Sequence, residues 1–337
     1  MSISDNSFSM STMFDALQNI RFSKGISGSI PPPGFTPRAS AVSNTRLSPL
    51  FNIMTSGEGV AAQFKEMISS LDRRHLHMMV SLLTSDADYF MEIVRNKYGS
   101  RRVQKLLGIS DDVDAFFYAV ILRRFLHIMT DKYASYVATR AMVVFEREKK
   151  KAMYEHILHY ALDIARDKHG CIALNEVITD VDDPYYRNQM LDVVAHNALF
   201  LSNDASGNFV VQHVLKLYDM RCTHNVAVSL RGHCVDLSLK KYGSYIVEKL
   251  LEAEETMDVV VVELLECERD KLRRLGRDEF GSFVVVKALR VTQKNRIDLF
   301  WDLVEKLMPL LDFFRRSHGS SIANILESCS ISTRRFN

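Results

Sequence analysis

Cysteine pairs, long apolar runs and proline are scarce in this sequence, and each absence excludes a class of protein. The five cysteines are scattered and include no C-x-x-C pair, so the spacing typical of zinc and thiol–disulfide sites is missing. No apolar run approaches the roughly 20 residues that a membrane-spanning helix needs, and the N-terminus lacks a basic-then-apolar signal pattern. We therefore expect a cytoplasmic protein with reduced thiols and no membrane partner, with the nucleus as the alternative location.

Net charge is also low. The 337 residues carry a formal charge of only +2, so a strong unspecific attraction to phosphate is not indicated and any nucleic-acid role must depend on individually placed residues. The hydrophobic fraction of 47% predicts that most of the chain packs into a core. The length suits either two ordinary domains or one extended repeat array.

The chain divides near residue 45. Residues 1–45 are rich in Ser, Gly and Pro, including Pro31-Pro32-Pro33-Gly34, and are expected to form a disordered leader. From about residue 60 onward only Pro184 and Pro309 interrupt long apolar-periodic stretches, so residues 46–337 are expected to be helical throughout.

Two stretches illustrate the predicted helices. Residues 111–129 combine early aspartates with apolar residues at helical spacing, namely Leu122, Phe125, Leu126 and Met129, and predict one capped helix. Another helix is predicted to begin at Asp183-Pro184, because an acidic N-cap followed by proline favours a first turn.

A short phrase recurs seven times along the chain. Its central Gly or Ala positions lie 35, 36, 37, 36, 38 and 38 residues apart, and they are Gly99, Ala134, Gly170, Gly207, Gly243, Gly281 and Gly319. A period near 36 residues predicts an all-α solenoid, in which each unit buries its apolar face only by stacking on its neighbours. Each unit has room for a first helix, a short turn at the Gly, and a second helix that starts there.

We number the places along the second helix so that the residue directly after the Gly is the first place. Apolar residues occupy the third, fourth, seventh and eighth places, as in Val210, Val211, Val214 and Leu215. These places form one stripe at about 100° per residue. The first, second and fifth places fall within another wedge and carry small or amide groups, aromatics or Arg, and Gln or Glu. Such a set can hydrogen-bond a base edge and stack on its face, although capping, packing and solvation could each explain the same residues one by one.

At these residues the sequence resembles the Pumilio (PUF) family, a group with divergent members in plants. The resemblance rests on the phrases Gly207-Asn208-Phe209-Val210-Val211-Gln212 and Tyr242-Gly243-Ser244-Tyr245-Ile246-Val247-Glu248, and extends over roughly residues 60–330. It implies a right-handed α-solenoid of about 36-residue repeats that binds single-stranded RNA, chiefly mRNA, to regulate translation or stability. It further implies a monomer without catalytic site, metal or cofactor, whose convex face can bind regulatory proteins.

The family's pairing rules imply which bases are read. Asn208 with Gln212 would read uracil, Ser244 with Glu248 guanine, and Ser100 with Gln104 adenine. Because RNA runs antiparallel to the repeats in this family, the expected motif contains 5′-GU, with A three bases 3′ of the U. Stacking would come from the second places, which suit a base face in five repeats: Arg101, Tyr136, Phe209, Tyr245 and Phe283.

Three pairs depart from the family pattern. They are Ser135/Thr139, Cys171/Asn175 and Ser282/Val286, and Val286 cannot hydrogen-bond a base. Registered backward from a C-terminal cap at Gly319, Gly281 falls in the eighth repeat and Gly99 in the third. Only a vestige precedes Gly99, around Met54 to Met67, so one or two N-terminal repeats are missing or unrecognisable.

Lysines precede the repeated phrase in four units, at positions 97, 132, 168 and 241. They are suited to neutralise phosphates, and they are equally compatible with a solvated turn.

An enzyme and a protein-binding scaffold are the alternatives to RNA binding. No nucleotide-loop, nucleophile-elbow or H-E-x-x-H motif is present, which argues against an enzyme. The pairs His75/His77 and His156/His159 lack a further ligand at suitable spacing, and Cys171 beside His169 occupies a repeat position. A protein-binding scaffold resembling HEAT or armadillo arrays, or a Pumilio-like protein that has lost RNA affinity, remains open.

Overall fold

The computed structural model describes residues 49–315 and 318–334, and the chain forms two units that divide between His156 and Ile157. The expected leader of residues 1–45 lies outside the described residues. No strand occurs in the described ranges, and none of their helices is long and apolar enough to cross a membrane. The helices confirm the predicted all-α solenoid of stacked repeats.

The first unit contains two repeats and the vestige before them. Residues 49–55 are helical, and the later elements are η2 (Glu58–Val60), α3 (Ala61–Ser70), α4 (Arg73–Thr84), α5 (Ala87–Arg95), α6 (Lys97–Leu106), α7 (Asp111–Arg123), α8 (Phe125–Met129) and α9 (Ser135–Val144). Helix α4 packs on α7, and α6 packs on α9. The vestige is tied to α6 by the buried Arg102, whose guanidinium donates to the carbonyl oxygens of Met54, Ser56 and Gly57.

Helix α10 (Arg147–Arg166) runs across the division, and the second unit continues the repeats. Its elements are α11 (Gly170–Asp180), α12 (Pro184–His196), α13 (Ala198–Ser202), α14 (Gly207–Lys216), α15 (Met220–Leu230), α16 (Cys234–Ser238), α17 (Lys241–Glu252), α18 (Glu254–Glu266), α19 (Arg269–Leu275), α20 (Gly281–Asn295), α21 (Ile297–Leu307), η3 (Met308–Leu310), α22 (Leu311–Phe314) and α23 (Ser320–Arg334).

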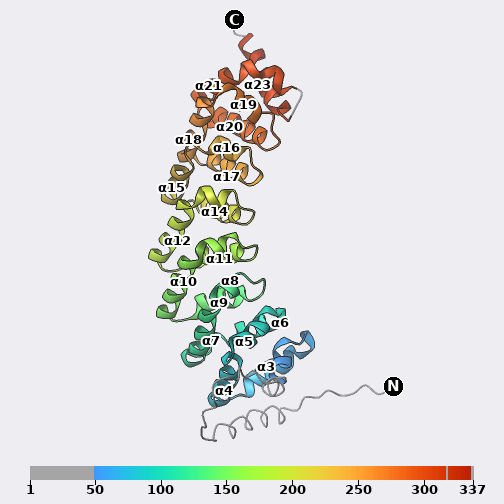
Figure 1. The fold of residues 1–337 in the computed structure, drawn as a ribbon, viewed down its shortest axis with the longest axis vertical. Coiled ribbons are helices and arrows are strands. Elements are labelled where there is room, and N and C mark those ends of the chain that lie inside the picture. Colours follow the sequence, from blue (N-terminus) through green and yellow to red (C-terminus); the bar gives the residue numbers. More distant parts are fainter. Residues whose placement is uncertain (1–48, 316–317, 335–337) are drawn as a thin grey trace, which may run out of the picture. The chain divides into compact units, whose positions relative to one another are not determined.

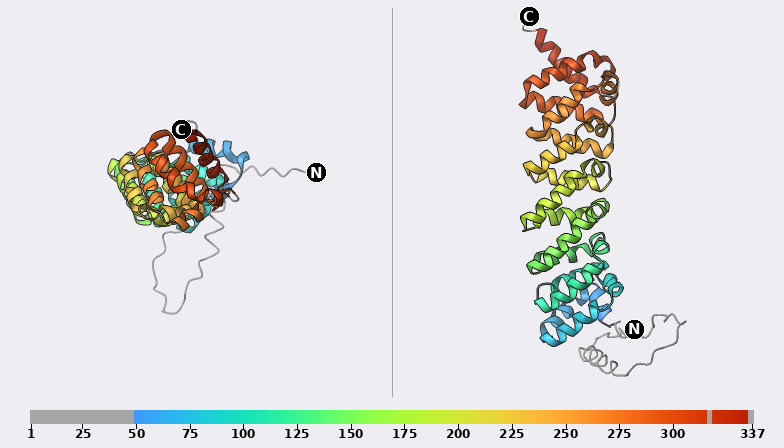
Figure 2. Two further views of the ribbon diagram at one scale, coloured as in Figure 1. Left: turned by 90° about the horizontal axis from the view of Figure 1, so that it is seen from above. Right: turned by 60° about the vertical axis from the view of Figure 1, so that its left-hand side comes forward.

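Within the second unit the repeats stack as two rows of helices. The outer helices α12, α15, α18 and α21 pack on one another in sequence, and so do the inner helices α11, α14, α17, α20 and α23 (Figure 1). A second view shows the same helical hairpins one above another (Figure 2). Each hairpin therefore buries its apolar stripe against its neighbours, as expected for a solenoid.

The predicted apolar stripe is buried. Val210, Val211 and Val214 are fully enclosed in α14, and the corresponding residues of α17 are equally enclosed. Each such side chain stabilises the fold by about 1.5–3 kcal/mol relative to an exposed one. Periodicity alone thus identified the core of the inner helices.

The prediction of two helices per repeat is wrong, because most repeats have three. A short helix of five to nine residues separates outer from inner helix, and it is α5, α8, α13, α16 or α19. The stretch 111–129, expected as one helix, breaks at Arg124, where φ is −124° and ψ is 25°. The outer helix α10 remains continuous over 20 residues. The start at Asp183-Pro184 is confirmed, since the Asp183 side chain accepts a hydrogen bond from the Tyr185 N–H.

Each repeat glycine allows the inner helix to approach the short helix closely. A Cβ built on Gly281 would lie 2.6 Å from the Leu275 carbonyl oxygen, and one on Gly243 would lie 2.6 Å from that of Leu237. Real Cβ atoms do not approach backbone oxygens so closely, so a side chain there must shift one helix. Glycine is needed at these positions for space and not for an unusual backbone angle.

Replacing this glycine should therefore destabilise the solenoid. We expect Gly281→Ala to lower the melting temperature, with a cost of about 1–3 kcal/mol from overpacking. Gly59→Ala is the control, because no atom lies within 4 Å of a Cβ at Gly59. Thermal unfolding followed by circular dichroism checks both variants; equal melting temperatures for the two would contradict the steric explanation.

Candidate nucleic-acid interface

The second place of every inner helix is exposed to solvent. Tyr136 is 50% exposed, Phe209 56% and Phe283 64%, and Tyr245 lies in the same place of α17. Arg101 is likewise exposed, as are Ile172 and Ser321 at the corresponding positions. Large aromatic side chains are seldom left this open at regular spacing, and their flat faces are available for stacking. The structure thus supports the second places as the accessible part of the predicted site.

The first place lies deeper than the second. Its six side chains are at most 6% exposed, and they are Ser100, Ser135, Cys171, Asn208, Ser244 and Ser282. Several of them bond to the preceding turn or to the next repeat. The Asn208 Nδ2 donates to the carbonyl oxygens of Asp204 and Ala205, and the Ser100 Oγ donates to that of Tyr133 at 2.6 Å. First-place side chains therefore lie beneath the fifth-place side chains, away from solvent.

First and fifth places meet as predicted in two repeats. The Gln104 Nε2 donates to the Ser100 Oγ at 3.0 Å, and the Gln212 Nε2 donates to the Asn208 Oδ1 at 3.0 Å. Both glutamines are half-buried. In this arrangement each Gln carbonyl oxygen and its second N–H remain able to bond a ligand, which suits a base edge that offers one acceptor and one donor.

Glu248 is the acidic residue among the predicted fifth-place residues. Its carboxylate is half-buried, and no hydrogen-bond or ion-pair partner for it occurs among the described residues. The neighbouring Lys249 and Lys287 pair instead with Glu252. Burial raises the pKa of Glu248 above its ordinary 4.5 despite the nearby Lys287. A desolvated acceptor without a donor is therefore poised at this position to receive hydrogen bonds.

The three irregular pairs present less to a ligand. Thr139 and Val286 are buried, and the Thr139 Oγ1 is directed to the Tyr136 carbonyl oxygen at 3.4 Å. The Asn175 Oδ1 is buried without a protein partner. Burial, with Asp167 nearby, raises the pKa of the Cys171 thiol, which makes it unsuited to act as a nucleophile. The structure therefore keeps Cys171 and Asn175 in repeat positions and gives Thr139 and Val286 a packing role.

The four predicted lysines are exposed, and three of them lie over the aromatic ring that follows. The Lys97 Nζ is 5.8 Å from the Tyr98 ring centroid, and the corresponding distances at Tyr133 and Tyr242 are 5.0 and 5.6 Å. These rings hold the ammonium groups of Lys97, Lys132 and Lys241 near the start of an inner helix, where they can contact phosphate.

The histidine pairs have structural roles. His77 contacts Asp112, and His75 contacts Asp72 at its own helix start. The His156 ring bonds to the Ala152 carbonyl oxygen within α10. In the described part of the chain no group of three metal-ligating side chains comes together.

Sequence reasoning missed a capping residue three positions before the repeat glycine. At Asn96, Asp131, Asp167, Asp204 and Asp278 the side-chain oxygen accepts the backbone N–H groups two and three residues ahead. The recurring Asp or Asn was visible in the sequence and is typical of an N-cap. Lys240 takes this position before Gly243, where α17 has no side-chain cap.

Two of these caps also link consecutive repeats through arginine. Arg95 pairs with Asp131 at 3.5 Å, and Arg166 pairs with Asp204 at 3.1 Å. Each arginine lies four residues before one repeat glycine, and its partner lies three residues before the matching residue of the next repeat, Ala134 or Gly207. The acid thus fixes the start of an inner helix and joins it to the previous repeat.

Comparison with known proteins agrees with this geometry. A model of the Pumilio-family RNA binding repeat matches residues 124–158, 160–195, 197–220 and 233–265. The chain is 70% identical over 329 residues to Pumilio homolog 18 of Arabidopsis thaliana, covering 97% of this chain and 98% of that protein. It is 68% identical over the same length and coverage to the putative Pumilio homolog 19 of that plant.

Solved structures show the same fold at lower identity. The Puf4 RNA-binding domain, bound to an HO endonuclease RNA 3′ UTR recognition sequence, matches with a TM-score of 0.72 at 22% identity, over 82% of this chain and 87% of that one. The RNA-binding domain of yeast Puf5p bound to SMX2 RNA matches with a TM-score of 0.62 at 18% identity, over 84% and 85%.

The cap at Asp204 makes a testable contribution to stability. Burial raises its pKa, but the N–H groups of Gly207 and Ser206 and the Arg166 guanidinium more than compensate, so the pKa lies below its ordinary 3.8. A depressed pKa gives stability that is present above about pH 4 and is lost as pH falls through the folded-state value. We expect Asp204→Ala to cost about 0.5–2 kcal/mol at neutral pH.

Chemical denaturation at several pH values measures this effect. The difference between wild type and Asp204→Ala should shrink as pH falls below about 4. Asp204→Asn should keep most of the cap but lose the pH dependence, because the amide oxygen still accepts the N–H groups. Asp302→Ala, an exposed residue of α21, is the control and should have little effect. A pH-independent difference would argue against the carboxylate cap.

Proposed function

This chain belongs to the Pumilio family, together with its plant members, and on that basis we propose that it binds single-stranded RNA with base selectivity. The bases would be read by first and fifth places and stacked on second places of the inner helices. The observation that carries the proposal is the unpaired carboxylate of Glu248, set one turn after Ser244 and beside the exposed Tyr245.

Glu248 is matched to guanine by hydrogen-bond chemistry. A carboxylate accepts two hydrogen bonds, and guanine offers the adjacent N1 and N2 donors, a pair that uracil and adenine lack. Binding guanine would give the half-buried carboxylate the donors that the protein does not supply, which makes the contact favourable. Tyr245 would cover one face of the same base.

The neighbouring repeat is matched to uracil. Gln212 retains a carbonyl oxygen and an N–H after bonding to Asn208, and uracil presents the N3 donor beside carbonyl acceptors. Phe209 would stack on it, as Tyr245 does on guanine. Since the two repeats are consecutive in the second unit, their bases should be adjacent in the RNA.

We also propose a class of RNA targets and a cellular role for this chain. The solved Puf4 RNA-binding domain is bound to a 3′ UTR recognition sequence, and this supports mRNA 3′ untranslated regions as the targets of this chain and post-transcriptional regulation in the cytoplasm as its role. No catalytic step is proposed, because the accessible groups are suited to contact bases and phosphates.

Selection of RNA from a random pool by the purified protein tests the function. We expect an enriched 5′-GU step, with A three bases 3′ of the U from Ser100 and Gln104. The positions read by the three irregular pairs should be poorly specified, since Thr139 and Val286 are buried. Recovery of no consensus would instead support a helical-repeat scaffold that binds protein.

A sharper test changes the base preference of one repeat by substitution. Ser244→Asn with Glu248→Gln should exchange the preference at one position from G to U, shifting relative affinity by about 1–3 kcal/mol. Tyr245→Ala should weaken all bases alike, by about 1–3 kcal/mol for a lost stack. Fluorescence anisotropy with RNAs that differ at this base measures both effects.

Glu255→Gln supplies the matched control for charge. It removes the same carboxylate charge from an exposed position of α18, so base preference should stay unchanged. If the double variant folds but keeps the preference for G, then Ser244 and Glu248 do not read RNA.

A further inference from the structure

Glu252 lies one turn after Glu248 on α17, outside the first, second and fifth places. Both of its carboxylate oxygens are occupied. The Lys287 Nζ of α20 donates to Oε1 at 2.9 Å, and the Lys249 Nζ donates to Oε2 at 2.5 Å. The proposed base-reading function leaves this arrangement unexplained.

The contact between α17 and α20 follows a register that recurs in the second unit. Glu252 occupies the ninth place of its inner helix, and Lys287 occupies the sixth place of the next one. The same two places meet between α11 and α14, where the Thr179 Oγ1 lies 2.9 Å from the His213 Nε2. In both cases a sixth-place side chain reaches across to the preceding inner helix and meets its ninth place.

Lys249 is the sixth-place residue of α17, and it faces a different situation. The ninth place of α14 is Lys216, and two ammonium groups cannot neutralise each other. Lys249 pairs instead with Glu252, three residues later in its own helix, a spacing that brings side chains together. Glu252 thus holds the sixth-place cations of two consecutive repeats.

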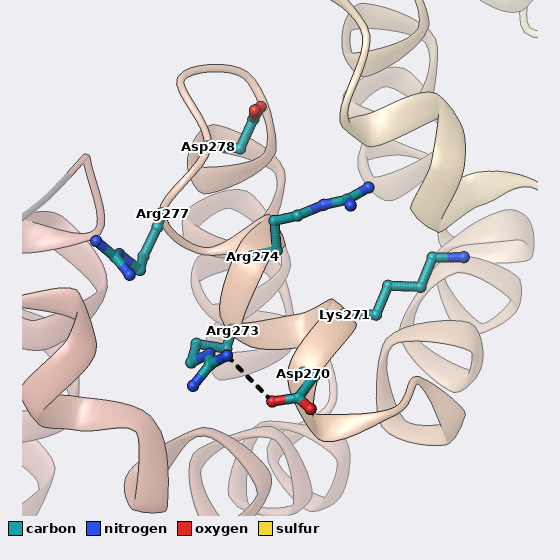
Figure 3. Close-up of a pocket in the computed structure, with 6 residues that line it drawn as sticks. All are labelled: Asp270, Lys271, Arg273, Arg274, Arg277 and Asp278. Carbon is teal, nitrogen blue, oxygen red and sulfur yellow. Dashed lines mark ion pairs between the residues drawn. The ribbon is translucent and has the colours of Figure 1, made fainter.

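Acids and cations of the second unit pair in the same two ways elsewhere. In a cavity at α19, Arg273 pairs with Asp270 across one turn at 3.3 Å (Figure 3). Lys271 lines the same cavity and pairs with Asp236 of the preceding repeat at 2.7 Å. Glu248 departs from this behaviour, because its half-buried carboxylate has no ion-pair partner among the described residues although lysines are near.

Glu248 lies within the electrostatic reach of the lysines that Glu252 holds. Burial raises the pKa of Glu248 most, the charges of Lys287 and Lys249 oppose this rise, and the charge of Glu252 adds to it. Residues four apart on a helix have Cβ atoms only about 5–6 Å apart, a separation that a lysine side chain can span. Glu248 is the other acidic residue of α17, so without Glu252 the two ammonium groups would have it as their neighbouring carboxylate.

An ammonium group at Glu248 would change what the fifth place offers to a base. It would occupy a carboxylate oxygen that guanine needs for its N1 or N2 donor, and it would present N–H groups of its own. Such donors suit the N1 acceptor of adenine. The pair would then discriminate less between two purines, both of which can stack on Tyr245.

We infer that Glu252 is a positioning residue for base selection, which holds Lys249 and Lys287 away from Glu248 and so keeps that carboxylate free for guanine. The inference rests on the proposed function, because it concerns the same base-reading pair. Glu252 itself needs no contact with RNA in this role. It acts by removing competing donors from the site, which is how a specific site rejects the wrong ligand.

The experiment compares the selected RNA with a copy in which A replaces the G of the 5′-GU step. The full chain is used as wild type and as Glu252→Gln, and fluorescence anisotropy gives the affinities. We expect Glu252→Gln to reduce the preference for G over A about 2- to 5-fold, the scale of a partly exposed ion pair. The affinity for the A-containing RNA should not fall, because the substitution removes one negative charge and frees two positive ones.

Two further variants separate positioning from a structural effect. Adding Lys249→Gln and Lys287→Gln to Glu252→Gln removes the cations that would pair with Glu248, so the preference for G should return. Damage to α17 would not be repaired by two more substitutions. Glu255→Gln removes the same charge from an exposed position of α18 and should leave the preference unchanged.

The outcomes distinguish this inference from the proposed function. If wild type does not prefer G at this position, base reading by Ser244 and Glu248 fails, and the inference fails with it. If wild type prefers G and Glu252→Gln prefers it equally, only the positioning role is refuted. That role is also refuted if Glu252→Gln weakens both RNAs alike, or if the triple variant remains as unselective as Glu252→Gln.

Discussion

The inner helices α6, α11, α14, α17 and α20 start where a glycine lies against the carbonyl oxygen of the residue six positions earlier, and the placement of the functional side chains depends on that approach. Because a Cβ cannot fit, the short helix and the inner helix come together closely at Gly243 and Gly281. An acidic or amide side chain three residues before most of these glycines then caps the inner helix. With its start fixed, the first place is directed inward, the second outward and the fifth between them.

Much of this arrangement could be predicted from the sequence. The period of the repeated phrase predicted a solenoid, and the apolar stripe predicted which side chains are buried, because both follow from helix geometry. The contact between Asn208 and Gln212 was predictable for the same reason. The short helix was missed because the apolar spacing continues through Arg124, so the break is set by packing and leaves no trace in the period.

The depth of the first place also lay beyond sequence reasoning. Places one and five are only about 40° apart on a helix, so periodicity assigns them to one face. The structure buries the first place because the turn before it, and in the case of Ser100 the turn of the next repeat, covers that side chain. Burial there is a property of neighbouring repeats, which one helix cannot reveal. The capping acids, by contrast, could have been found by aligning the phrases three residues further back.

The exception to the capping pattern has a consequence for how the surface attracts a polyanion. Before Gly243 the acid is replaced by Lys240, which is followed by the exposed Lys241. The change turns a local negative charge into a positive one at the start of α17, the helix that carries Glu248, the one predicted base-contacting group that is itself acidic. A carboxylate would otherwise repel an approaching strand where it must come closest, and the two lysines offset that repulsion at long range while leaving the short-range hydrogen-bond chemistry of Glu248 intact. The uncapped start of α17 thus exchanges some helix stability for an electrostatic potential that lets an acidic side chain serve a negatively charged ligand.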